Sequence, residues 1–220
     1  MQFSYSSLST MNSCPLCFWL DRKMKLARPE GIKSGMPNQV DGILKERLEK
    51  FRGALPPQLE GIKELEGFVL YDDPEMKKMR HWASNPLNID LPGGHRVIGA
   101  FDDLLYNPTT KEFAYLDYKT TGKEPDQAFG EKYYQSQADT YTAMILHAKR
   151  KAAKFGILLF FWPAASETGL VDFKSKAIVV VPQPAQAVKT FAEAIKLLEG
   201  PRPEPGDCEY CAYVGKRISL

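Results

Sequence analysis

Apolar residues recur at helical spacing in three long stretches of the chain. Residues 38–51 have such a stripe, with Asp41, Lys45 and Glu49 on a different one, and Asn38 is a suitable N-cap. Residues 125–154 form the longest stretch, and residues 184–198 are amphipathic. A shorter helix is expected at 74–83, where proline occupies the first position. These patterns predict four helices of very different length.

Strand-like segments lie between these helices. Continuous apolar runs at 156–162 and 177–181 are typical of buried strands, and 67–71 predicts a short one. Residues 95–106 and 113–119 are rich in β-formers and flank a turn around Asn107-Pro108-Thr109-Thr110, so we expect an antiparallel hairpin. The order of elements predicts an α/β fold with a central mixed β-sheet flanked by helices.

The composition indicates a globular protein but does not indicate a function. The chain has 220 residues, 44% of them hydrophobic and 25% charged, which is ordinary for a globular protein with one core. Its longest apolar stretch, 155–165, is shorter than the about 20 residues of a membrane span. The N-terminus lacks the pattern of a signal peptide, so we expect a cytoplasmic protein without a membrane partner. A net charge of +2 is too small to indicate nucleic-acid binding by itself.

The hairpin carries the most informative chemistry of the chain. Asp102 and Asp117 lie on its two strands, and Lys119 shares a face with Asp117 because side chains alternate along a strand. Two carboxylates and a lysine in this arrangement are typical of a metal-dependent phosphodiesterase. Either aspartate alone is better explained as a strand-end carboxylate satisfied by turn amides or surface lysines, and only the combination with Lys119 favours a catalytic role. Asp103 faces the opposite side and is expected to be structural.

Three motifs in order resemble those of the PD-(D/E)XK nuclease superfamily, in particular its RecB-like branch, which includes CRISPR-associated RecB-like exonucleases. The motifs are Gly99-x-x-Asp102, Asp117-x-Lys119 and Gln137-x-x-x-Tyr141. The resemblance implies a restriction-endonuclease-like core in a single domain over residues 1–220. It also implies that Gln137 and Tyr141, which share one helix face, position the substrate and the active-site network.

Carried over to this sequence, the resemblance implies a metal centre. Asp102, Asp117 and the backbone carbonyl of Tyr118 would bind Mg²⁺ or Mn²⁺, since hard oxygen ligands suit hard divalent cations. Lys119 would orient the attacking water or stabilise charge developing on phosphorus. Hydrolysis of a phosphodiester is the implied reaction.

The family usually places a histidine or an acid on a helix upstream of these strands, and the matching helix here carries Asp41. Asp41 is therefore expected to be a direct or water-mediated metal ligand. The alternatives on the chain are three histidines and one glutamate, namely His81, His95, His147 and Glu46.

All four cysteines of the chain form two C-x-x-C pairs, Cys14 with Cys17 and Cys208 with Cys211. Four thiolates at this spacing predict one metal site that joins the termini, with residues 1–35 and 200–220 as a cysteine lobe beside a core at 36–199. The resemblance implies a 4Fe-4S cluster, while the two-plus-two arrangement also fits Zn²⁺ or a 2Fe-2S cluster.

Together these features predict a metal-dependent DNA nuclease, an exonuclease acting on single-stranded ends, with proteins of repair, recombination or CRISPR adaptation as partners. The alternatives are a nucleic-acid-binding scaffold subunit with weak or no cleavage, and a nuclease acting on RNA. Phe18, Trp19, Arg22 and Lys23 form either a DNA-contacting lip or, for the two aromatic residues, part of the core.

Overall fold

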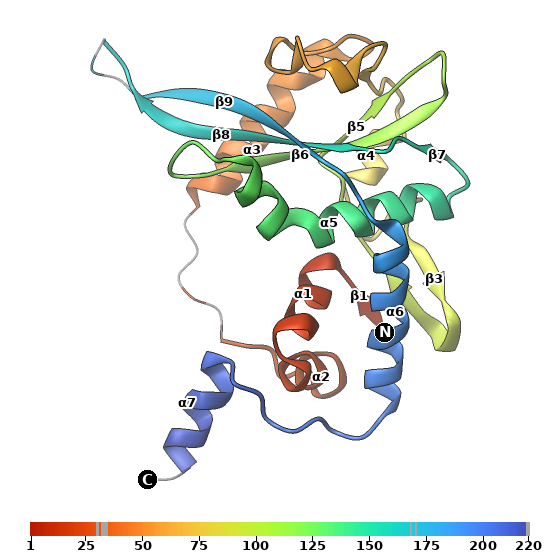
Figure 1. Cartoon of the computed structure of the whole chain (residues 1–220), viewed down its shortest axis with the longest axis vertical. Helices are drawn as coiled ribbons and strands as arrows, with labels where there is room; N and C mark the ends of the chain where they lie inside the picture. Colours follow the sequence, from red (N-terminus) through yellow and green to blue (C-terminus); the bar gives the residue numbers. More distant parts are fainter. Residues whose placement is uncertain (30, 32–34, 168, 170, 219–220) are drawn as a thin grey trace.

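A curled mixed sheet is the centre of the computed structural model, which describes residues 1–29, 31, 35–167, 169 and 171–218 (Figure 1). Its strands run in the order β2-β5-β6-β8-β9, and β7 pairs with β6 outside this path. β6 and β8 are parallel, whereas β5–β6 and β8–β9 are antiparallel. The strands are β2 (Val69–Leu70), β5 (Asp103–Tyr106), β6 (Glu112–Thr120), β7 (Lys151–Ala152), β8 (Gly156–Ala165) and β9 (Val171–Val180). The predicted central mixed sheet is confirmed.

Helices cover both faces of this sheet. α5 (Gln127–His147) packs against β6, β8 and β9, and α6 (Pro184–Glu199) packs against α5. α3 (Met36–Leu48) lies over β6 on the other face. None of the helices among the described residues has the length and apolar character needed to cross a membrane.

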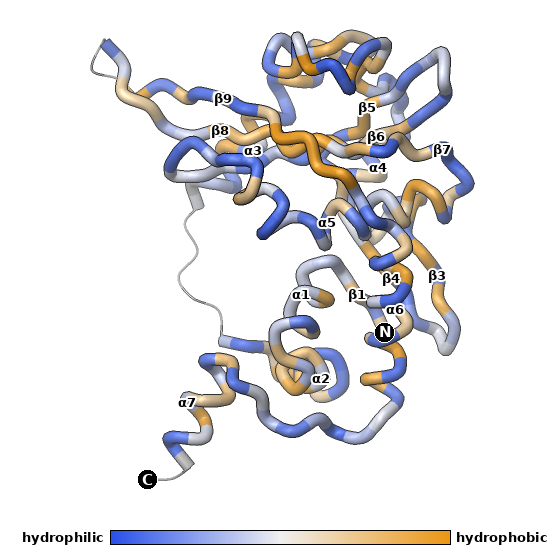
Figure 2. The backbone as a smooth tube through the Cα atoms, viewed as in Figure 1, coloured by the Kyte–Doolittle hydropathy of each residue, from blue (hydrophilic) through white to orange (hydrophobic). Residues whose placement is uncertain are grey.

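The two faces of the sheet bury different side chains of the same strands. Leu158 and Phe160 of β8 belong to the core under α5, whereas Ile157 and Leu159 belong to a second core on the α3 side. All four are fully buried. Because both faces of β8 are covered, its apolar residues do not alternate with polar ones. Figure 2 shows the most hydrophobic part of the tube where β9 crosses the sheet beside β8.

The strand expected at 95–106 is wrong as a single element. β4 (His95–Val97) lies in a separate small sheet between β1 (Gln2–Phe3) and β3 (Ile89–Leu91), and β5 begins only at Asp103. Residues 98–102 connect the two sheets. Side-chain amides replace the ladder there, since Gly99 N donates to Asn88 Oδ1 at 3.1 Å and Asn85 Nδ2 donates to Gly99 O at 2.8 Å.

Two helix predictions were too long. The helix expected at 125–154 ends at His147, because Lys149 adopts a left-handed conformation with φ of 59° and the chain then enters β7. The helix expected at 74–83 is reduced to α4 (Met76–Met79). The helix expected at 184–198 is confirmed by α6 and the short strand at 67–71 by β2.

Three terminal helices were not expected from periodicity: α1 (Tyr5–Ser13), α2 (Pro15–Met24) and α7 (Glu209–Ile218). α1 begins with a capping box in which Ser4 and Ser7 exchange hydrogen bonds. Phe3, Leu8 and Phe18 are buried in the same continuous core as α5, and the segment packs against α5 and α6. The lip interpretation therefore fails for Phe18, while Trp19 packs partly buried against the same core. The lobe boundary expected near residue 35 adjoins 32–34, which lie outside the described residues.

Candidate active site

The β5–β6 hairpin brings the two acidic motifs to one end of the sheet. Leu104 pairs with Tyr115 across the hairpin, and Asp103 with Leu116 closes the ladder at the site end. At the opposite end the turn is held by Asn107, whose Oδ1 accepts N–H bonds from Thr109 and Thr110 at 2.9 and 3.1 Å. Asp102 lies just before β5, and Asp117 lies within β6.

Asp117 is held between two side chains. Gln137 Nε2 donates to Asp117 Oδ1 at 2.7 Å, and the Lys119 ammonium forms an ion pair with Oδ2. Asp117 is 3% exposed, and the Lys119 nitrogen also lies 4.9 Å from the centre of the Tyr134 ring. Strand alternation therefore directs Asp117 and Lys119 to the α5 face, as the sequence predicted, and brings Gln137 to them.

Asp102 has a donor on each oxygen. The Tyr118 N–H donates to Oδ2 at 2.9 Å, and the Lys45 ammonium lies 2.7 Å from Oδ1. Tyr118 lies beyond the last β5–β6 pair, so its N–H is directed to Asp102 instead of to a strand. In an extended strand the N–H and C=O of one residue point to the same side, so the Tyr118 carbonyl is directed to the Asp102 edge as well.

Burial and the charge of Asp102 both act on the Asp117 carboxyl group. Burial raises the pKa of Asp117 to about 7, and the negative charge of Asp102 acts in the same direction. Burial alone would lower the pKa of Lys119, but the charge and the hydrogen bond of Asp117, together with the charge of Asp102, outweigh it and raise that pKa. The residues present fit a hard divalent cation, because such an ion would relieve the repulsion that raises the Asp117 pKa and would find carboxylate and carbonyl oxygens as ligands.

Tyr141 acts on the loop that precedes Asp102. Its hydroxyl donates to the Ala100 carbonyl at 2.8 Å, and its ring stacks on Phe101 with centroids 4.4 Å apart. A Cβ at Gly99 would lie 3.0 Å from Tyr141 Cε1, so only glycine allows this approach without displacing the ring. Tyr141 thus positions Asp102 through the backbone of residues 99–102.

Asp41 is connected to the centre by Lys45, a residue for which the sequence predicted no role there. Lys45 Nζ lies 2.7 Å from Asp41 Oδ2 as well as from Asp102 Oδ1. Asp41 and Leu44 also share a cavity of about 210 Å³ with Lys119 and Thr120 of β6. The (i, i+4) spacing of Asp41 and Lys45 was the available signal, since such pairs meet on one helix face.

Asp103 has the structural role expected of it. It is fully buried and binds Arg52 through both oxygens, at 2.6 and 2.8 Å, and Arg80 at 2.9 Å. Arg80 Nε also donates to the Asp102 carbonyl at 2.8 Å. The Arg52–Arg80 pair therefore fixes the backbone from which the Asp102 side chain extends.

Glu49 completes this arginine cluster and predicts a pH dependence of stability. The hydrogen bond from Arg52 and the charge of Arg80 lower the pKa of Glu49 from 4.5 to about 2. A lowered pKa stabilises the fold above pH 4.5, and this contribution is lost as the pH falls towards 2. We expect Glu49→Gln to unfold at lower urea concentration than wild type at pH 7, by a modest amount because Glu49 is 44% exposed.

That difference should shrink progressively below pH 4.5 and vanish near pH 2. Glu46→Gln, at an exposed position near the end of α3, is the control and should follow wild type throughout. A Glu49→Gln deficit that stays constant with pH would contradict the assignment.

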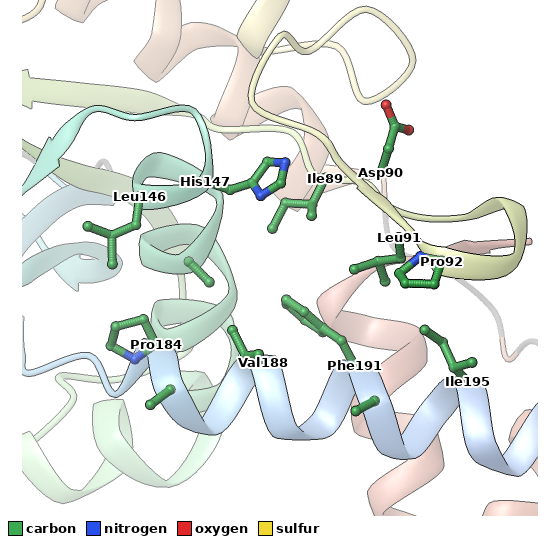
Figure 3. A pocket seen from close by; sticks show the side chains of 13 residues that line it. Ile89, Asp90, Leu91, Pro92, Leu146, His147, Pro184, Val188, Phe191 and Ile195 are labelled. Atoms are coloured by element: carbon green, nitrogen blue, oxygen red, sulfur yellow. The ribbon is translucent and has the colours of Figure 1, made fainter.

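The alternative metal ligands from the sequence lie elsewhere. His95 stacks on Phe3 with ring centroids 5.3 Å apart, and His81 stacks on Trp82. His147 lines an apolar cavity of about 710 Å³ between β3, α5 and α6 (Figure 3). Glu46 is exposed on α3.

The four cysteines converge from the two ends of the chain, on α2 with its N-cap and at the start of α7 (Figure 1). Their sulfur atoms all lie within 4.8 Å of one another. Cys14 Sγ lies 3.7 Å from that of Cys211, and Cys17 Sγ lies 3.6 Å from that of Cys208. The backbone N–H of Cys211 lowers the pKa of Cys208 to about 6, which favours a thiolate. These cysteines can hold a metal, as the sequence predicted.

Similarity to known proteins identifies the family of this chain. No curated protein matches the chain. A solved structure titled "Crystal structure of SSO0001" is 12% identical, with a TM-score of 0.45 over 97% of this chain and 84% of that chain. The profile of the PD-(D/E)XK nuclease superfamily matches residues 42–215, which include the hairpin, α5 and the second cysteine pair. The chain therefore belongs to the PD-(D/E)XK nuclease superfamily.

Proposed function

We propose that this protein is a metal-dependent DNA nuclease of the RecB-like branch, an exonuclease that acts on single-stranded ends. Membership of the superfamily implies a metal-dependent phosphodiesterase acting on nucleic acid. The observation that carries the assignment is the buried Asp117, which is held by Gln137 and Lys119 and faces the repulsive charge of Asp102.

Each residue of the centre has a distinct role in this proposal. Asp102, Asp117 and the Tyr118 carbonyl hold Mg²⁺ or Mn²⁺. When bound, the ion supplies a Lewis acid that polarises the scissile phosphate and lowers the pKa of a water. Lys119 stays protonated beside Asp117 and either orients the water or stabilises charge on phosphorus. Gln137 keeps the Asp117 carboxylate in one orientation.

The start of α5 supports a single-stranded substrate. Tyr133 is 57% exposed, and its ring lies 4.8 Å from that of Phe129 and 5.2 Å from the Lys132 ammonium. These residues share a hollow with Lys123 and with Thr121, which directly follows β6. An exposed ring beside lysines is the combination that stacks unpaired bases and contacts their phosphates.

The experiment is degradation of end-labelled DNA by the wild type and by Lys119→Ala, with Mg²⁺, Mn²⁺ or EDTA. Wild type should degrade single-stranded DNA only with metal, and the variant should be slower by about 10²–10³-fold, the usual effect of removing one charge-stabilising donor. Lys189→Ala, which removes an exposed lysine of α6, is the matched control and should cleave at the wild-type rate.

Cleavage without metal dependence, or equal cleavage by Lys119→Ala, would contradict the proposal. DNA binding without cleavage would favour the alternative of a scaffold subunit in a repair, recombination or CRISPR-adaptation complex. Duplex DNA and RNA of the same sequence, run in parallel, decide the substrate.

For the cysteines we propose a single Zn²⁺ in place of the 4Fe-4S cluster that the resemblance implied. A tetrahedral zinc ion with Zn–S bonds of about 2.3 Å places its sulfur ligands about 3.8 Å apart. The Sγ–Sγ distances of 3.7 and 3.6 Å agree with this spacing, and all four sulfur atoms lie within 4.8 Å of one another. In a 4Fe-4S cluster each cysteine binds a different corner of a cube, which spreads the sulfur atoms further apart.

In the proposed single domain, this metal site would link the N-terminal helices to the C-terminal segment. Anaerobically purified protein should be colourless and contain zinc. Brown protein that contains iron would contradict the zinc assignment and favour the cluster.

A further inference from the structure

Lys45 lies between two carboxylates at the proposed metal centre. Its ammonium is 2.7 Å from Asp41 Oδ2 on its own helix and 2.7 Å from Asp102 Oδ1. The two oxygens therefore lie no further apart than twice this distance. Two carboxylates at this spacing can also hold a divalent ion that bridges them.

We propose that the Lys45 ammonium is a built-in cation that replaces a second divalent ion between Asp41 and Asp102, so that the centre binds a single divalent ion. The inference rests on the proposed function, because it requires Asp102 and Asp117 to hold that ion. Asp41 then serves as the anchor of Lys45 and not as a ligand of the metal.

The contacts of Asp102 divide the centre into two sides. Its Oδ1 faces Lys45, and its Oδ2 accepts the Tyr118 N–H next to the carbonyl of the same residue. Asp117 directly precedes Tyr118 in β6, so the Oδ2 side of Asp102 is the side of the second carboxylate. The divalent ion would lie on this Asp117 side, because the Asp41 side already holds a cation.

The position of Lys45 is restrained rather than accidental. It lies one helical turn from Asp41, and its side chain is only 25% exposed. Its ammonium has a carboxylate oxygen 2.7 Å away on each side, and these two charge-assisted contacts hold the side chain in this position.

The charge balance also favours one divalent ion. The three carboxylates of Asp41, Asp102 and Asp117 face the two ammonium groups of Lys45 and Lys119, which leaves one net negative charge. One divalent ion changes this to one positive charge, which a single scissile phosphate neutralises. A second divalent ion would add two uncompensated positive charges in a partly buried site.

The test is calorimetric titration of folded, metal-depleted protein with Mn²⁺, which reads binding without requiring catalysis. Wild type should bind one ion per chain. Lys45→Met, which keeps an unbranched side chain but removes the charge, should bind two, because Asp41 and Asp102 are then free to share an ion. The double variant Asp41→Asn/Lys45→Met should return to one. Lys50→Met removes an exposed lysine just after the end of α3. It is the matched control and should bind one Mn²⁺ ion.

Two ions in wild type, or one ion in folded Lys45→Met, would overturn the inference while leaving the nuclease assignment intact. No Mn²⁺ binding by wild type would overturn the proposed metal centre and the inference together. If Lys45→Met does not fold, Asp41→Asn decides, because it should keep Mn²⁺ affinity within about threefold of wild type. A loss of tenfold or more would make Asp41 a metal ligand and overturn the inference.

Discussion

Replacing Asp117 by asparagine is expected to abolish Mn²⁺ binding and to slow DNA cleavage by about 10³-fold. Asparagine keeps the shape of the side chain and can still accept a hydrogen bond from Gln137, but it removes the negative charge shared with the metal. Losing several kcal/mol of charge stabilisation in the transition state corresponds to about three orders of magnitude in rate.

The readouts are single-turnover cleavage and the rise in melting temperature that Mn²⁺ produces in the metal-depleted protein. Wild type should be stabilised by Mn²⁺, because an ion that binds only the folded state shifts the unfolding equilibrium. Asp117→Asn should fold without metal and show no such shift. Asp172→Asn, an exposed aspartate on β9, is the control for charge removal. Retained Mn²⁺ stabilisation in Asp117→Asn would contradict the role assigned to this carboxylate.

Replacing Cys208 by serine is expected to release the metal from the cysteine site and to lower the melting temperature by about 10 °C. Serine is a poor ligand for a soft site, and three thiolates hold zinc more weakly than four. Loss of a few kcal/mol of metal-linked stability corresponds to about 2–4 °C per kcal/mol in a chain of this size.

The measurements are metal content after gel filtration and thermal unfolding by circular dichroism. Asp207→Asn, next to Cys208 and exposed, should retain both the metal and the wild-type melting temperature. A strong chelator should lower the melting temperature of wild type but not that of Cys208→Ser. Unchanged metal content and melting in Cys208→Ser would show that the four cysteines do not form a metal site.

Local patterns predicted the parts of the fold that depend on short-range geometry. Alternation along a strand was sufficient to direct Asp117 and Lys119 to one face, and the helical period placed Gln137 and Tyr141 together. The run at 156–162 indicated a strand buried on both faces, which β8 is. The helix expected at 125–154 failed at its end, because a left-handed residue at Lys149 is not visible in hydrophobic periodicity.

Long-range contacts decided what the patterns missed. The break before Asp102 depends on amides of Asn85 and Asn88 and on the Tyr141 ring, all distant from it in sequence. Lys45 was visible only as a lysine on a polar stripe, and its position at Asp102 follows from the packing of α3 on β6.

The sequence by itself thus determined the order of the motifs, the superfamily resemblance and the side of the hairpin on which Asp117 and Lys119 lie, since each follows from spacing along one strand or one helix. Only the tertiary structure decided how the charges combine. The approach of Lys45 to Asp102 and the approach of the cysteine sulfurs to one another depend on segments far apart in the chain, 197 residues in the case of Cys14 and Cys211. Their meeting is governed by core packing, which no local pattern encodes.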